Sequence, residues 1–107
     1  MAKENKFQAD LIKEIESRFD GSIVTKLDSG HIQGIPDILI LYNDRWAALE
    51  CKKSRNEHHQ PNQDWYVEKM NQMSYSSFIY PENKEKVLDE IEQAFKPRRK
   101  ARVSKSK

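Results

Sequence analysis

Two carboxylates and a lysine stand beside two apolar segments of the sequence. Asp37 immediately precedes the run 38–42, and Glu50 and Lys52 close the run 46–52. Because side chains alternate along a strand, Glu50 and Lys52 point to the same face of a sheet if this run is a strand. The pattern predicts a charged cluster at one end of two otherwise apolar strands.

The turn between the two runs decides whether Asp37 reaches the other charged residues. Asn43-Asp44-Arg45 is typical of a hairpin turn. With the turn centred near Asp44, positions 37 and 51 lie almost opposite each other. Cys51 then points away from the charged face into the core, and we expect a buried strand residue rather than a nucleophile.

Two carboxylates held close together repel each other unless a positive charge lies between them. Ligands that are all oxygen suit Mg²⁺ or Mn²⁺. Such a cation lowers the pKa of bound water and polarises a phosphoryl oxygen, and a nearby lysine stabilises developing negative charge. His58 and His59 lack the further partners that a zinc site needs. The cluster therefore predicts a magnesium or manganese site.

Each part of the cluster is weak evidence by itself. A lone Pro-Asp is usually a turn, and a lone Glu-x-Lys is usually a surface pair on a strand. Here both stand on the apolar strands of one predicted hairpin. Their combination favours the metal site over either structural interpretation.

The surrounding pattern predicts an α/β fold, a mixed β-sheet flanked by helices in the order α-β-β-β-α-β-α. Apolar residues recur at three- and four-residue spacings in the helical segments, and short apolar runs mark the strands. The helix after the hairpin can cross over between two parallel strands. The expected elements are a helix over 3–19, strands over 22–27, 38–42 and 46–52, a helix from Pro61 to about 73, a strand over 77–80, a break over 81–83 and a helix over 84–95.

The second predicted helix and its flanks carry a surplus of apolar and aromatic residues. Trp65, Met70 and Met73 are expected to be buried positions. Together with Tyr66 and Tyr75 they form either part of the core, which we favour, or the interface of a homodimer.

Length and charge set the remaining limits. The chain has 107 residues, which predicts a single domain over 1–95. The segment 96–107 holds seven of the 19 Lys and Arg and no acid, which leaves 12 basic against 17 acidic residues in the rest. A basic tail on an acidic body either contacts phosphates or is a disordered, solvated end.

The sequence has one cysteine and no signal-peptide pattern. It also has no apolar run near the roughly 20 residues needed to span a bilayer. These features predict a soluble, cytoplasmic protein without a membrane partner.

The motif and the order of elements resemble the PD-(D/E)xK nuclease superfamily. The resemblance rests on Gly-Ile-Pro-Asp37 and on Glu50-Cys-Lys52, and it covers roughly residues 7–95. Within that superfamily the chain is most similar to the small VRR-NUC domains and to Holliday junction resolvases of the archaeal type, of which phages often encode stand-alone versions. The resemblance implies a restriction-endonuclease-like fold and metal-dependent phosphodiester hydrolysis.

The resemblance also implies roles for matching residues. Asp37 and Glu50 would be metal ligands, the backbone carbonyl of Cys51 a third ligand, and Lys52 the catalytic lysine. Many members place a glutamine on the next helix, and Gln63 fits that position, with Gln60 one turn earlier as the alternative.

A glutamate on the first helix also reaches the metal in many members of the superfamily. Glu14 is the best candidate because it lies beside the apolar stripe of the predicted helix. Glu16 is less well placed, and Asp10 is a further possibility. A solvated helix face is an equally good interpretation of Glu14.

The implied substrate is DNA, and a structure-selective endonuclease on branched DNA such as a Holliday junction is favoured. Cleaving both strands of a two-fold junction requires two sites, hence a homodimer. A non-catalytic binding or assembly module with the same fold, a basic-tailed binding protein without metal, and a flap or single-strand nuclease remain as alternatives. The expected DNA contacts are Ser29, His31, Lys53, Arg55, Arg98, Arg99 and Lys100.

Overall fold

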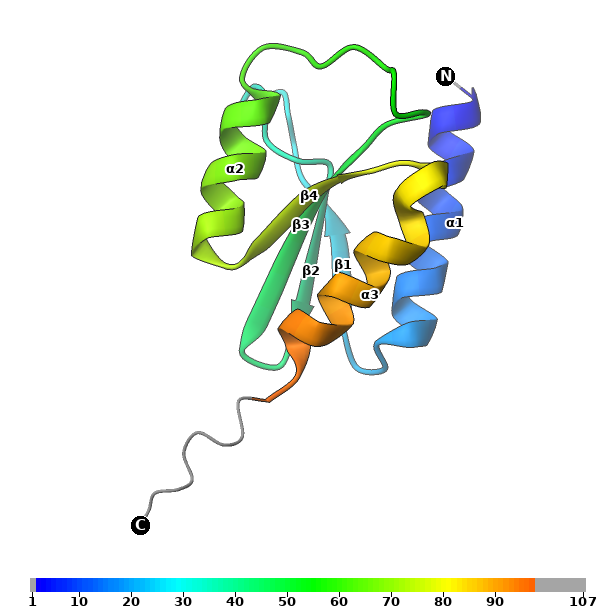
Figure 1. Ribbon diagram of the computed structural model, residues 1–107, viewed down its shortest axis with the longest axis vertical. Coiled ribbons are helices and arrows are strands. Elements are labelled where there is room, and N and C mark those ends of the chain that lie inside the picture. Colours follow the sequence, from blue (N-terminus) through cyan, green and yellow to red (C-terminus); the bar gives the residue numbers. More distant parts are fainter. Residues whose placement is uncertain (1, 98–107) are drawn as a thin grey trace.

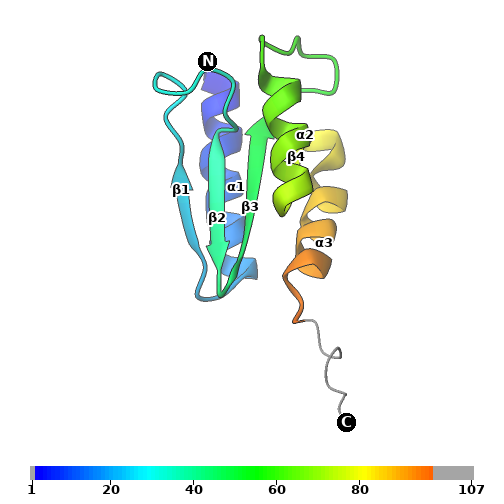
Figure 2. The ribbon, with the colours of Figure 1, turned by 90° about the vertical axis from the view of Figure 1, so that its left-hand side faces the viewer.

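The protein folds around one four-stranded mixed sheet with helices on both faces (Figures 1 and 2). The computed structural model describes residues 2–97. The predicted α/β class and the order α-β-β-β-α-β-α are confirmed, and a short 3₁₀ helix occupies the expected break. The elements are α1 (Ala2–Arg18), β1 (Ile23–Lys26), β2 (Ile38–Tyr42), β3 (Arg45–Cys51), α2 (Gln63–Met73), β4 (Tyr75–Ile79), η1 (Pro81–Asn83) and α3 (Lys84–Phe95).

The strands lie in the order β1-β2-β3-β4. β1 pairs antiparallel with β2, and β2 pairs antiparallel with β3, whereas β4 pairs parallel with β3. The connection from β3 to β4 runs through α2. The predicted hairpin and the predicted crossover helix are therefore both confirmed.

The centre of the turn in the β2–β3 hairpin lies half a residue earlier in the chain than expected. Its loop is the pair Asn43-Asp44, flanked by the pair Tyr42 and Arg45, and Asn43 takes a positive φ of 56°. Ile38 faces Leu49, so continuing this register places Asp37 opposite Glu50 rather than opposite position 51. The predicted pairing was wrong by one residue because the tight two-residue loop, which suits the strand twist, is centred between 43 and 44.

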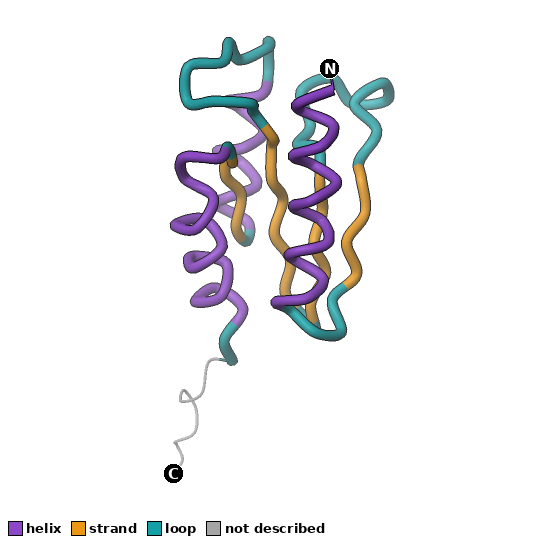
Figure 3. Tube along the Cα trace, turned by 90° about the vertical axis from the view of Figure 1, so that its right-hand side faces the viewer, coloured by secondary structure: helices purple, strands orange, loops and turns teal. Residues whose placement is uncertain are grey.

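The hydrophobic core lies on one face of the sheet, beneath α1 and α3 (Figure 3). Even-numbered residues of β2 and odd-numbered residues of β3 point into it, as strand alternation requires. Cys51 is among them and is fully buried, as predicted. The fully buried apolar side chains include Leu11, Ile15, Ile38, Ile40, Leu49, Ile79, Leu88 and Ile91.

The opposite face is covered by α2 alone, over β3 and β4 (Figure 2). The strand residues Ala48 and Ser76 are small and buried, and α2 buries Val67. Trp65 and Met73 are 59% and 67% exposed, so the prediction that both are buried was wrong. They stand two and six residues from Val67, and at 3.6 residues per turn both spacings lead to the far side of the helix.

Candidate functional site

The predicted charged cluster lies on the α2 face of the sheet, at the end where β2 begins and β3 stops. Asp37 precedes β2, and Glu50 and Lys52 lie at the end of β3. Figure 1 shows that the loops 27–37 and 52–62 also meet at this end. Glu50 and Lys52 are only 4% and 3% exposed. Charged side chains so deeply buried are rare unless paired, which marks this cluster as unusual.

Gln63, the first residue of α2, joins the lysine to the glutamate. Its amide oxygen accepts a hydrogen bond from Lys52 Nζ at 2.7 Å, and its amide nitrogen donates one to Glu50 Oε2 at 2.8 Å. Lys52 Nζ also donates to the backbone oxygen of His58 at 3.1 Å and lies 3.8 Å from Glu50 Oε2. Because one amide serves both charges, the three side chains are held as a unit.

Of the two glutamines considered from the sequence, Gln63 is the one with its side chain in the cluster. Gln60 contributes its backbone N–H, which donates to the Gln63 amide oxygen at 2.9 Å. Because this bond and the bond from Lys52 Nζ both end on the amide oxygen, they fix which way the Gln63 amide points.

Asp37 is held against β3 by the backbone. The Cys51 N–H donates to Asp37 Oδ2 at 2.9 Å. Burial raises the pKa of Asp37 above its ordinary value, although the Cys51 N–H, the Lys52 charge and a side-chain hydrogen bond with Glu50 lower it. Two carboxyl groups share a hydrogen bond only when a proton lies between them. The pair therefore favours a proton, or another cation, between its oxygens.

The raised pKa of Asp37 predicts how stability changes with pH. An acid whose pKa is raised by folding stabilises the fold below its ordinary pKa, and that contribution is lost as pH rises through the raised value. We expect Asp37→Asn, which keeps an acceptor for the Cys51 N–H, to be more stable than the wild type at neutral pH in EDTA. A tenfold change in proton affinity corresponds to about 1.4 kcal/mol.

Urea unfolding between pH 3 and 8, in EDTA and in Mg²⁺, measures this effect. The free energies of unfolding of the two proteins should become equal at the acidic end. At neutral pH, Mg²⁺ should reduce the difference between these two free energies. A constant difference at all pH values would contradict the assignment of the elevated pKa to Asp37.

A backbone contact brings the two halves of the cluster together. Gly34 has a φ of +93°, and a Cβ built on it would lie 2.6 Å from Asn62 Cβ and 2.9 Å from the Asn62 carbonyl carbon. Asn62 itself has a φ of 74° and directly precedes Gln63. The absence of a side chain at Gly34 lets the segment that carries Asp37 close against the start of α2.

The donor atoms of the cluster fit a hard divalent cation. Asp37 and Glu50 offer adjacent carboxylate oxygens, and the strand geometry turns the Cys51 backbone toward Asp37. Oxygen donors of this kind are those that Mg²⁺ and Mn²⁺ take. Within residues 2–97, no group of three or more His, Cys, Asp or Glu side chains is arranged to hold a metal ion. The side chains present thus amount to two ligands, with main-chain oxygen and water left to complete the set.

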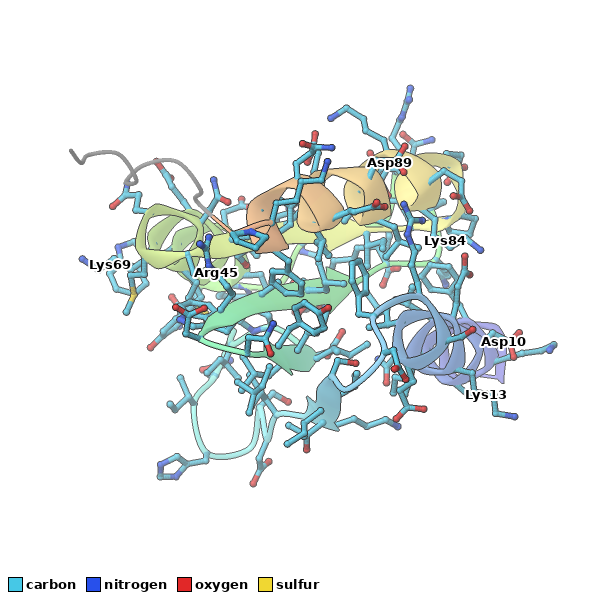
Figure 4. All side chains as sticks on the ribbon, turned by 90° about the horizontal axis from the view of Figure 1, so that it is seen from below. Asp10, Lys13, Arg45, Lys69, Lys84 and Asp89 are labelled. Atoms are coloured by element: carbon cyan, nitrogen blue, oxygen red, sulfur yellow. The ribbon has the colours of Figure 1, made fainter. Side chains whose placement is uncertain are left out.

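The glutamate expected from the first helix is not part of this cluster. Glu14 accepts a hydrogen bond from Lys84 Nζ at 2.7 Å, and Figure 4 shows Lys84 on the side of α3 nearest α1. Asp10 pairs with Lys6 at 2.9 Å, and Glu16 is exposed. The structure therefore gives Glu14 a role in joining α1 to α3, and it does not bring Glu14 to Asp37 and Glu50.

The residues expected to contact DNA lie in exposed loops where the structure describes them. Ser29 and His31 are exposed in the loop that leads to β2, and Lys53 and Arg55 are exposed just after β3. Figure 1 places both loops at the site's end of the sheet. Arg98, Arg99 and Lys100 lie outside the described residues.

The sequence analysis missed two contributors to the site. The backbone oxygen of His58 is a partner of Lys52, and Glu57 accepts a hydrogen bond from the Lys53 N–H at 2.6 Å. Both belong to a polar loop without periodicity. Of the two, only Glu57 could have been suspected from the sequence, because it is an acidic residue close to Glu50 and Lys52.

Together the fold and the site define an α/β protein with a buried carboxylate–amide–lysine cluster at one end of its sheet. Comparison with protein-family models, curated proteins and solved structures finds no match to the chain. Among the described helices none has the length and apolar character to cross a membrane.

Proposed function

We propose that this protein is a metal-dependent endonuclease of the PD-(D/E)xK type, with a restriction-endonuclease-like fold, acting on branched DNA. The observation that carries the proposal is the meeting of Asp37, Glu50 and Lys52. All three lie on one sheet face, and the Gln63 amide joins Glu50 to Lys52. A buried cluster of this composition adds nothing to the apolar core and costs stability, so a chemical role is the better explanation.

Each side chain then has a defined task. Asp37 and Glu50 would hold Mg²⁺ or Mn²⁺, with the Cys51 carbonyl as a third ligand, and the bound metal would supply charge stabilisation and activate water. Lys52 places its ammonium group beside Glu50, where it stabilises negative charge on the phosphate. Gln63 keeps the Lys52 ammonium and the Glu50 carboxylate in place.

The proposed substrate is branched DNA, and the proposed active form is a homodimer within the cell. The chain is small, and its one site serves one strand, so two-fold cleavage of a junction needs a second copy. Among the described residues, the 59% exposed Trp65 and the 67% exposed Met73 on α2 are apolar side chains available for such an interface, as are Ile23 and Leu41 on the neighbouring strands. The loops with Ser29, His31, Lys53 and Arg55, and the basic tail, supply phosphate contacts.

The test is cleavage of a labelled four-way DNA junction in Mg²⁺, in Mn²⁺ and in EDTA, beside a linear duplex and a flap of matched length. The wild type should nick the junction only with metal and should cut the duplex weakly. Asp37→Asn should keep the hydrogen bond from the Cys51 N–H, lose the charge of the metal ligand and fail to cleave any of the substrates.

The outcomes separate the alternatives. Equal cutting of all substrates retains the nuclease and removes the preference for branched DNA. Preferential cutting of the flap identifies the protein as a flap nuclease. Binding of DNA without cutting in either metal overturns the enzyme proposal and favours a non-catalytic binding module.

A further inference from the structure

The loop after β3 folds a third carboxylate back onto the end of β3, near which the candidate metal site lies. The loop turns between Ser54 and Glu57, where the Glu57 N–H donates to the Ser54 backbone oxygen at 3.2 Å. Ser54 Oγ accepts the Asn56 N–H at 3.2 Å and braces the same turn. As a result the Glu57 carboxylate lies against the end of β3, where it accepts the Lys53 N–H at 2.6 Å.

The hydrogen bonds at the end of β3 show how near Glu57 lies to Asp37 along the chain. The Lys52 N–H donates to the Ile79 oxygen, so position 52 faces β4. In a strand, the N–H and C=O groups of one residue point to one side, and those of the next residue point to the opposite side. The Cys51 N–H therefore points away from β4 and donates to Asp37, and the N–H of Lys53, two residues further on and just beyond β3, donates to Glu57.

Two carboxylates thus accept the N–H groups of residues 51 and 53, at the end of β3 and just beyond it. The Cys51 carbonyl lies between these two N–H groups along the chain. The charge of Glu57 acts on Asp37 across this interval: burial is the main cause that raises the pKa of Asp37, and the negative charge of Glu57 raises it further. The loop therefore concentrates negative charge beside the proposed metal ligands.

We propose that Glu57 is the third carboxylate of the cation site, a positioning residue that binds the water ligands of Mg²⁺ or Mn²⁺ held by Asp37 and Glu50. This inference rests on the proposed function. Mg²⁺ keeps several of its waters when proteins bind it, and carboxylates that hold such outer ligands typically contribute 10–100-fold in metal affinity. Glu57 takes the role that the sequence suggested for Glu14, whose carboxylate pairs with Lys84 instead.

The test is the affinity for Mn²⁺, measured by calorimetry and by the spin-resonance signal of free Mn²⁺, in the wild type and in Glu57→Gln. The amide oxygen of glutamine still accepts the Lys53 N–H, so the loop keeps its bond and loses only the charge. We expect Glu57→Gln to weaken Mn²⁺ binding about tenfold or more. Its melting temperature in EDTA should stay close to that of the wild type.

Two matched variants control for charge and for the competing assignment. Glu68→Gln removes a charge from an exposed position of α2 and should leave Mn²⁺ affinity unchanged. Glu14→Gln should lose stability through Lys84 and likewise keep its Mn²⁺ affinity. Wild-type affinity in Glu57→Gln, or an equal loss in Glu68→Gln or Glu14→Gln, overturns the role of Glu57 while the metal site stands. A wild type that binds no Mn²⁺ overturns the metal site itself and this inference with it.

Discussion

Replacing Lys52 with methionine should reduce metal-dependent cleavage by about 10²–10³-fold, the usual loss when one group that stabilises transition-state charge is removed. Lys52 is 3% exposed, and its ammonium group has partners in Gln63, His58 and Glu50. Methionine fills a similar volume without the charge. Steady-state cleavage of the junction with wild type and variant at saturating Mg²⁺ measures the loss.

The same substitution should also reduce stability in the absence of metal. It leaves Glu50, which is 4% exposed, with Asp37 beside it and no cation nearby. Breaking one half of a buried charge pair typically costs about 3–5 kcal/mol. Urea unfolding in EDTA at pH 7 measures this cost.

Two variants test whether charge pairing is the cause. Lys53→Met removes the neighbouring charge from an exposed position and should change stability by less than about 0.5 kcal/mol. Adding Glu50→Gln to Lys52→Met neutralises the remaining glutamate and should restore much of the lost stability but none of the activity. An active Lys52→Met protein would contradict the catalytic role of the lysine.

The elements that the sequence predicts well are those fixed by local pattern. The helix over 84–95 was predicted with the bounds observed, because Val87, Leu88, Ile91 and Phe95 repeat on one face and Pro97 follows. The clustering of Glu50 and Lys52 on one face, and of Cys51 on the other, follows from strand alternation alone. Neither result needs any knowledge of distant contacts.

Features that depend on packing between distant segments could not be predicted from the sequence. Trp65 and Met73 are exposed because α2 packs on the sheet through Val67, and no pattern within the helix shows which of its apolar residues faces the sheet. Glu14 was expected at the metal, yet its partner Lys84 lies 70 residues away in the chain. Glu57 returns to the end of β3 because a loop without periodicity folds back on that strand.

The contact between Gly34 and Asn62 belongs to this second group and has a large predicted effect. We expect Gly34→Ala to destabilise the fold by about 2–5 kcal/mol, because a positive φ costs a residue with a Cβ about 1–2 kcal/mol and overpacking adds about 1–3 kcal/mol. The Cβ would lie 2.6 Å from Asn62 Cβ, 2.9 Å from the Asn62 carbonyl carbon and 3.1 Å from the Pro61 oxygen, and backbone atoms do not move aside cheaply. Thermal and urea unfolding in EDTA measure the loss.

Gly21→Ala supplies the matched control, since Gly21 has nearly the same φ of +90° and nothing within 4 Å of the position that a Cβ would take. Its loss should match the cost of the positive φ alone, so the difference between the two variants isolates the clash with 61–62. Because that clash pushes the segment leading to Asp37 away from the start of α2, Gly34→Ala should also lose cleavage activity at temperatures where it remains folded. Gly21→Ala, at the far end of β1, should keep that activity. Equal losses of stability in the two variants would show that the approach of Gly34 to Asn62 does not hold the site together.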